Sequence, residues 1–167
     1  GYGITFGSIL GDYLAGERFT KVCIRLVERY DKSSSKCIIY FVIGSLISHW
    51  TQHARKSIEY LEKAVKSGIE AGDVLIIGHS HCLLLEFSYF IGTPLEEMTE
   101  IIEKKSEIAG RLRHDTLHIN VAIYREVISA LREIGEDTLK SVSRNFQNNN
   151  FVKIAENDHT CIATFCF

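Results

Sequence analysis

Apolar residues recur every three or four positions through most of the 167-residue chain. This spacing places them on one face of an α-helix and predicts an all-α protein. Glycines, one proline and short polar stretches interrupt the pattern at intervals. Helices are expected at residues 2–15, 17–30, 36–51, 54–71, 74–91, 95–113 and 115–134, with a weaker helix at 136–146 and the beginning of another at 159–167.

Local signals mark several of the expected helix ends. Gly16 should break the first run, and Ser35 can cap the helix that follows a polar loop. Gly72 stops one helix and Asp73 caps the next, so two helices meet there with almost no loop. Loops this short predict antiparallel helix pairs.

Two later helices also carry start signals. Thr93 is a predicted N-cap, Pro94 suits the first helical position, and Glu96 completes a capping box. Asp115 can cap the following helix, and Gly135 can end it.

Residues 36–51 are apolar on nearly every side, so periodicity does not separate a buried helix from a strand. The length of the run favours a helix, whereas its β-branched residues favour a strand. We predict a helix. The clearer amphipathic segments should bury their apolar faces, which contain Phe19, Val22, Cys23, Leu26, Val27 and Tyr30, then Ile58, Leu61, Val65 and Ile69, then Leu95, Met98, Ile102, Ala109 and Leu112, and finally Leu117, Val121, Tyr124, Ile128 and Leu131.

An internal repeat is suggested by two similar segments that lie 76 residues apart (92 − 16 = 76). One further helix pair lies between them, so the period is 38 residues (76/2), close to the roughly 34 of tetratricopeptide units. The pattern predicts a right-handed superhelical stack of antiparallel helix pairs. The matched residues are Tyr13, Gly16, Phe19, Val22 and Leu26 in the first segment, and Tyr89, Gly92, Leu95, Met98 and Ile102 in the second.

Composition excludes few classes of protein, but it limits the expected partners and cellular compartment. The net charge is −2, which suggests neither nucleic acid nor an anionic membrane as a partner. The longest apolar run is too short to span a bilayer. The five cysteines lie mostly in apolar runs, which favours buried thiols in a reducing, cytoplasmic compartment.

The chain lacks a linker rich in proline or glycine, so residues 1–167 are expected to form a single domain. It begins without methionine and ends on the apolar residues TCIATFCF. We therefore expect a fragment of a larger multidomain protein. An unfinished stack would expose its last layer, which offers a surface for homodimerisation.

One motif suggests catalysis. An apolar run leads into Gly78-His79-Ser80, which is similar to the nucleophile elbow of serine hydrolases, where the serine lies on a strained turn between a strand and a helix. His118 or His159 could act as the base, and Asp158 or Asp115 could orient it. Against this hypothesis, Cys82 replaces the last glycine of the motif, and few segments are strand-like.

Seven histidines also raise the question of a metal site, for which zinc needs three or four converging ligands. No pair here has the glutamate or cysteine partners of common zinc motifs, and the simpler interpretation is hydrogen bonding between helices. The candidate groups are His49 with His53, His114 with His118, and His79 with Cys82 and Glu86.

Neither a phosphate-binding loop nor a dinucleotide-binding motif is present, so no cofactor is predicted. Stacked helix pairs commonly offer a groove to a peptide or to a neighbouring domain. The candidate groove residues are His49, His53, His79, Glu86, His118 and Arg125.

Residues 1–146 resemble the helical-repeat region of very large signalling proteins. The most specific part is His49, Trp50 and His53 with the later G-x-E-x-G-D motif at residues 68–73, and the segments LAGERFTKVCIRLVERY and IGTPLEEM also match. In those proteins the repeat region follows a predicted ATPase of the AAA/STAND type. A serine/threonine-kinase-like domain often precedes the ATPase, and GAF or PAS sensors and a histidine kinase often follow.

This resemblance implies a structural role rather than a catalytic one. The active sites of such proteins lie in other domains, so no catalytic, cofactor-binding or metal-binding residue carries over. Trp50 would fill the layer between helix pairs, and His49 and His53 would tie a helix end to its neighbour. The sequence therefore predicts a non-enzymatic scaffold for contacts between proteins or between domains in signal transduction, with a serine hydrolase as the alternative.

Overall fold

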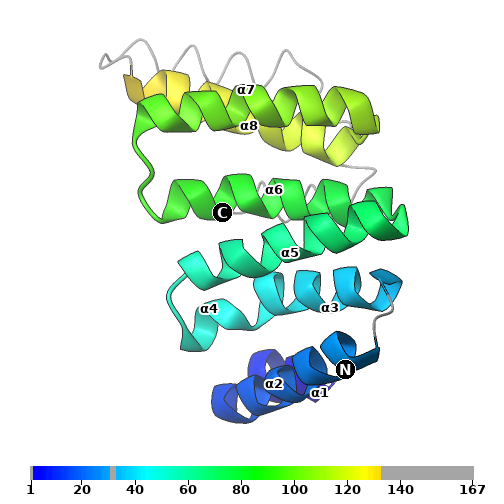
Figure 1. Cartoon of the computed structure of the whole chain (residues 1–167). Helices are drawn as coiled ribbons and strands as arrows, with labels where there is room; N and C mark the ends of the chain where they lie inside the picture. The colour runs from blue at the N-terminus through cyan, green and yellow to red at the C-terminus, as the bar shows by residue number, and fades with distance from the viewer. Residues whose placement is uncertain (1, 31–32, 133–167) are drawn as a thin grey trace. The chain divides into compact units, whose positions relative to one another are not determined.

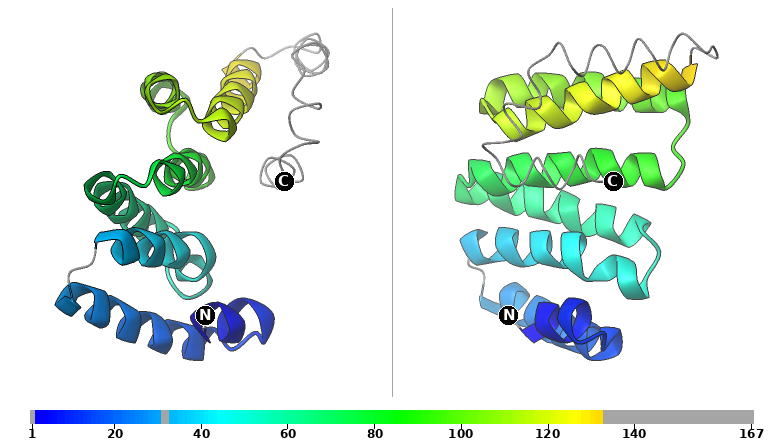
Figure 2. Two further views of the ribbon diagram at one scale, coloured as in Figure 1. Left: turned by 90° about the vertical axis from the view of Figure 1, so that its right-hand side faces the viewer. Right: turned by 180° about the vertical axis from the view of Figure 1, so that it is seen from behind.

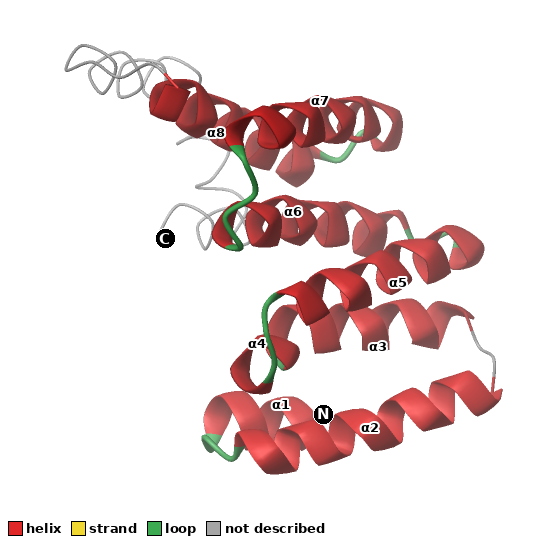
Figure 3. Cartoon of the chain, turned by 60° about the vertical axis from the view of Figure 1, so that its left-hand side comes forward, coloured by secondary structure: helices red, strands yellow, loops and turns green. Residues whose placement is uncertain are grey.

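The computed structural model describes residues 2–30 and 33–132, and every regular element in this part of the chain is helical (Figure 3). The all-α prediction is therefore confirmed. The chain divides into one compact unit that ends at Gly92 and a second that begins at Thr93. The first unit contains α1 (Tyr2–Ile4), the π-helix η1 (Thr5–Ile9), α2 (Tyr13–Tyr30), α3 (Ser33–Leu46), α4 (Ser48–Thr51), α5 (Arg55–Ala71) and α6 (Val74–Phe90), and the second contains α7 (Leu95–Leu112) and α8 (Asp115–Arg132).

Consecutive long helices of the first unit lie side by side and run in opposite directions (Figures 1 and 2). Helix α3 packs between α2 and α5, and α5 packs against α6. The short α4 contacts α2, α3 and α5, while α1 and η1 pack on α2. The helices predicted at residues 136–146 and 159–167, and the stop signal at Gly135, lie outside the described residues.

Small residues form the contact between α3 and α5. A Cβ atom on Gly44 would lie 2.9 Å from Leu61 Cγ and 3.0 Å from the carbonyl oxygen of Ser57. The hydroxyls of Ser48 and Ser57 form a buried hydrogen bond of 2.7 Å beside this contact. The two helices can approach closely here because Gly44 has no side chain to hold α5 away.

The prediction of which α5 residues face inward is only partly confirmed. Leu61 is fully buried, but Ile58 and Val65 are half-buried and Ile69 is exposed. The face that packs is rotated toward smaller residues, because these allow the closest approach of α5 to its neighbours. Its buried residues are Ser57, Leu61, Ala64, Ser67 and Gly68.

The first helix boundary differs from the prediction. Gly16 lies within α2, where a Cβ atom would come within 3.0 Å of the carbonyl oxygen of Gly3 and 3.2 Å of Gly7 Cα. The break comes earlier, at Gly11, whose φ of +72° favours glycine. Gly16 thus serves a close contact between helices, which a sequence pattern does not distinguish from a helix stop.

Residues 36–51 were predicted to form one helix. In the structure the helix begins earlier, and a break at Ile47 divides the segment into α3 and α4. Helix α3 begins at Ser33, so Ser35 lies inside the helix and is not its N-cap. The backbone leaves the helical conformation at Ile47 before α4, and it is extended at Gln52. The choice of helix over strand is confirmed.

The sharp boundary between α5 and α6 is confirmed. Gly72 adopts the left-handed conformation with φ of +69°, and its amide donates to the carbonyl oxygen of Ile69. Asp73 then caps α6, since its Oδ1 accepts a hydrogen bond of 3.0 Å from the amide of Ile76.

Within residues 93–132, the described part of the second unit, helices α7 and α8 form an antiparallel hairpin. The buried residues of the pair match the predicted faces at Met98, Ile102, Ala109, Leu117, Val121, Tyr124 and Ile128. Leu131 is an exception, because it is exposed.

The start signals of both helices act differently from the prediction. Pro94 is the N-cap residue of α7, with no side-chain cap hydrogen bond, so Thr93 does not cap it. At α8 the Nδ1 atom of the buried His114 accepts a hydrogen bond of 3.2 Å from the Leu117 amide. His114 therefore provides the cap assigned to Asp115, which is the first residue of the helix.

The two segments matched in the sequence do not correspond structurally. Gly16 lies inside α2, whereas Gly92 lies in a turn with φ of +79°. The helices themselves begin at regular intervals: the starts of α2, α5 and α7 are 42 and 40 residues apart (55 − 13 and 95 − 55). The superhelical stack remains a prediction.

Candidate functional site

Helix α2 carries a row of large apolar side chains on its exposed side, which we call the α2 stripe. It consists of Phe19, Val22, Leu26 and Tyr30, whose exposed fractions are 38%, 52%, 50% and 65%. Their spacing of three or four residues places them on one face of the helix. The sequence predicted this face as core, which is wrong for these four residues.

The α2 stripe is exposed because α2 packs through a different face. Its buried residues are Gly16, Thr20 and Val27. Gly16 lies against Gly3 and Gly7, and the Thr20 hydroxyl donates to the Gly16 carbonyl oxygen at 3.0 Å. Since the small residues allow this close packing, the bulkier row is turned outward.

Three exposed arginines, Arg18, Arg25 and Arg29, form a basic edge along the α2 stripe. Each precedes a stripe residue by one position, which places it about 100° around the helix. The Arg29 guanidinium also lies 5.9 Å from the centre of the Tyr30 ring. None of the three forms an ion pair with another described residue.

The two glutamates of α2 do not neutralise this basic edge. Glu17 pairs with Lys21 at 3.0 Å and accepts a hydrogen bond of 3.4 Å from Gln52. Glu28 interacts with Tyr40 of α3, and burial together with this negative charge raises the pKa of the tyrosine. The arginines of the edge are therefore left to face solvent.

A row of rings links three helices of the first unit. Tyr13 stacks on Trp50 with a centroid distance of 5.2 Å, and Trp50 lies 4.9 Å from the His49 ring. His49 in turn lies 6.0 Å from the Phe87 ring of α6. Trp50 does not fill a layer between helices, because 52% of it is exposed. Burial lowers the pKa of His49, whose Nδ1 has no hydrogen-bond partner in the part of the chain that the structure describes.

Ser80 does not have the geometry of a nucleophile elbow. It lies within the continuous helix α6 and is fully buried, and its hydroxyl has no hydrogen-bond partner among the described residues. Of its predicted partners, His118 and Asp115 are exposed on α8 of the second unit. The others, His159 and Asp158, lie outside the described residues.

The described residues bring together no group of three or more histidine, cysteine or acidic side chains that could hold a metal ion. His53 is exposed, and its Nδ1 accepts a hydrogen bond of 3.2 Å from the Arg55 amide. His114 is used in the same way at the start of α8.

The six residues predicted to line a groove are divided between the two units. His79 of α6 lies 6.4 Å from the Phe41 ring, and His118 is exposed on α8. The first unit contains His49, His53, His79 and Glu86, and the second contains His118 and Arg125. A groove that contains all six therefore remains a prediction.

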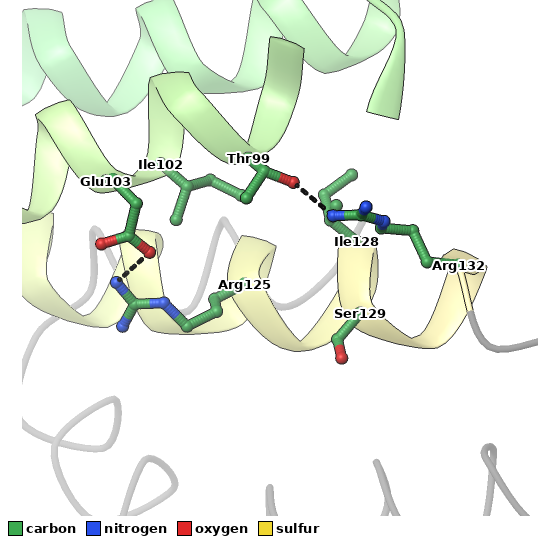
Figure 4. A pocket seen from close by; sticks show the side chains of 7 residues that line it. All are labelled: Thr99, Ile102, Glu103, Arg125, Ile128, Ser129 and Arg132. Carbon is green, nitrogen blue, oxygen red and sulfur yellow. Dashed lines mark hydrogen bonds and ion pairs between the residues drawn. The ribbon is translucent and has the colours of Figure 1, made fainter. Parts of the chain in front are cut away.

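A pocket of about 370 Å³ lies between α7 and α8 (Figure 4). Arg125 reaches across to Glu103 at 3.2 Å, and Arg132 donates a hydrogen bond of 3.2 Å to the Thr99 hydroxyl. Sequence analysis selected Arg125 but missed the other residues, because only pairing of the helices brings them together. The lining residues are Thr99, Ile102, Glu103, Arg125, Ile128, Ser129 and Arg132.

Comparison with known proteins assigns no family. A scan against protein-family models, a search of curated proteins and a search of solved structures each returned no match. Within residues 2–30 and 33–132, no helix has the length and apolar character needed to cross a membrane.

Proposed function

We propose that the chain is a non-enzymatic helical scaffold that binds another protein through the α2 stripe. The observation that supports this function is the exposed row of four large apolar side chains on one helix face. Isolated exposed apolar residues are common on proteins, but a contiguous row often marks an interaction surface. The partner would remove this row from water when it binds.

In this proposal the scaffold belongs to a larger signalling protein of the cytoplasm whose ATPase or kinase activity resides in other domains. The resemblance of residues 1–146 to the helical-repeat region of such proteins supports this setting. A binding role also agrees with the position of Ser80, because a fully buried hydroxyl inside α6 offers no access to a substrate. The serine hydrolase is therefore the weaker hypothesis.

Site-specific photo-cross-linking in the whole protein tests the docking surface. A benzophenone side chain at Val22 would report on the α2 stripe, and the same side chain at Glu62, exposed on α5, is the matched control. We expect a discrete adduct with one protein at position 22 that Leu26→Asp abolishes. Adducts that are equally strong at both positions, or that Leu26→Asp leaves unchanged, would argue against docking at α2.

A further inference from the structure

We propose that the occupant of the α2 stripe is an amphipathic helix of another protein, with acidic residues along the edge that faces Arg18, Arg25 and Arg29. This inference rests on the proposed function, because it names the chemistry of the partner at the same surface. Such a partner needs a linear apolar surface with a basic edge beside it, and a second copy of the chain must be a poor match for that surface. The structure supplies each of these.

The shape of the surface fits a helix. The α2 stripe runs from Phe19 to Tyr30 along a single helix, a rise of about 16 Å at 1.5 Å per residue. Phe6 of η1 stacks on Phe19, the first residue of the stripe, with a ring-centroid distance of 5.4 Å. A row spaced by three or four residues packs naturally against the same row on a second helix. An extended strand would find no unpaired backbone edge to join here, since α2 is a continuous helix.

The charge of the surface selects the partner. The three arginines follow one side of the α2 stripe, and none forms an ion pair within the described residues. A guanidinium can bind a carboxylate through two parallel hydrogen bonds, so glutamates or aspartates on the partner are the matching groups. A basic partner would be repelled along the whole edge.

The apolar row and the charged edge have different roles. The stripe residues are already partly covered, so their further burial provides only modest affinity. Binding must also offset the translational and rotational entropy that the two proteins lose on association. Complementary charges add little affinity each at an exposed rim, but they steer the encounter and discriminate between partners. The basic edge therefore makes the docking selective for an acidic helix.

Two copies of this chain do not suit the surface. An antiparallel twofold pairing of α2 with α2 would place the two basic edges on the same side of the interface, where they would repel each other. Helix α7 offers an acidic face with Glu96, Glu100 and Glu103, but its apolar residues are buried against α8. No helix of the described part combines an unpartnered apolar row with an acidic edge, so no described helix of a second copy provides the occupant.

A basic amphipathic helix can also bind an anionic membrane. Such a helix usually carries cations on both sides of its apolar face, so that it can lie flat in the headgroup region. In α2 the cations occupy one side of the stripe, and the other side continues into the packed face that contains Gly16 and Val27. This asymmetry favours a helix partner, and vesicles serve as the competing outcome of the test.

Binding of designed helical peptides to the full chain tests the inference. The probe is an amphipathic peptide with a leucine row and glutamates along one edge, and its counterpart carries lysines in place of the glutamates. By fluorescence anisotropy at low salt, we expect the acidic peptide to bind at least about fivefold more tightly, which corresponds to three weak ion pairs. The triple variant R18E/R25E/R29E should reverse the preference.

A matched variant separates this effect from overall charge. The substitutions K66E/K104E/R111E change net charge equally but affect exposed positions on α5 and α7, and should leave the preference intact. Circular dichroism checks that both variants fold. The inference is overturned if the acidic peptide does not bind saturably, if R18E/R25E/R29E leaves the preference unchanged, or if vesicles containing phosphatidylserine bind the chain and compete with the peptide. Cross-linking at Val22 without a charge preference would sustain the docking surface and reject only the acidic partner.

Discussion

At the scale of residues, the side chains that suggest chemistry in the sequence mostly serve packing and capping. Ser80 is buried in α6, and His114 caps α8 through its Nδ1. His49 lies between the rings of Trp50 and Phe87. The cap at His114 involves the nearby Leu117 amide, but the burial of Ser80 and the contact of His49 with Phe87 depend on residues far away in the chain. A motif such as Gly78-His79-Ser80 carries no such information, so it could suggest an elbow where the structure has a helix.

The environment of His49 predicts a pH dependence of stability. Burial lowers its pKa in the folded protein, so the unfolded chain binds a proton more readily. Stability should fall as the pH drops below the ordinary value of 6.5, and level off below the depressed folded pKa. Urea unfolding followed by circular dichroism should show a larger loss between about pH 7.5 and 5.5 for the native chain than for His49→Gln. Equal losses in the two proteins would contradict the assignment.

At the scale of elements, small residues decide which helix faces meet. Gly16 brings α2 close to α1 and η1, and Gly44 brings α3 close to α5. In both α2 and α5 the packed face is offset from the row of largest apolar residues, so that Ile69 and the α2 stripe remain exposed. Periodicity located both helices but not the faces through which they pack.

A pair of glycine substitutions tests the role of close contact. Gly44→Ala would place a methyl group 2.9 Å from Leu61 Cγ, so we expect a loss of about 1–3 kcal/mol in the free energy of unfolding. Gly110 in α7 has nothing within 4 Å of its Cβ position, and Gly110→Ala should stabilise by about 0.5–1 kcal/mol. Thermal and urea unfolding of the full chain measure both effects. A neutral result at Gly44 would mean that α3 and α5 can separate without cost.

At the scale of the whole molecule, the chain forms two compact units that meet in sequence at Gly92 and Thr93. The boundary follows the end of α6, where Gly92 adopts a positive φ and the next helix starts after Pro94. The sequence marks this place with a glycine and the chain's single proline. It was predicted as an ordinary connection between helices rather than as a boundary between units.

A fragment of residues 1–92 should fold by itself. It contains all helices of the first unit and the buried residues Leu61, Leu84 and Leu85. We expect helical circular dichroism and a single cooperative urea transition. A fragment of residues 1–82 is the control, because it ends inside α6 and lacks Leu84 and Leu85, and it should lose cooperativity. Failure of the longer fragment to unfold cooperatively would contradict the division.

The sequence by itself determined the helical class, most helix positions and the sharp turn at Gly72 and Asp73. These features depend on residues within a few positions of one another. Helical periodicity sets the helix positions, while the left-handed conformation of Gly72 and the cap formed by Asp73 set the turn. Only the tertiary structure decided that Gly16 is a contact, that Ser80 is buried and that the α2 stripe is exposed. Burial depends on which neighbouring helix can come closest, and that is set by small residues distant in the chain.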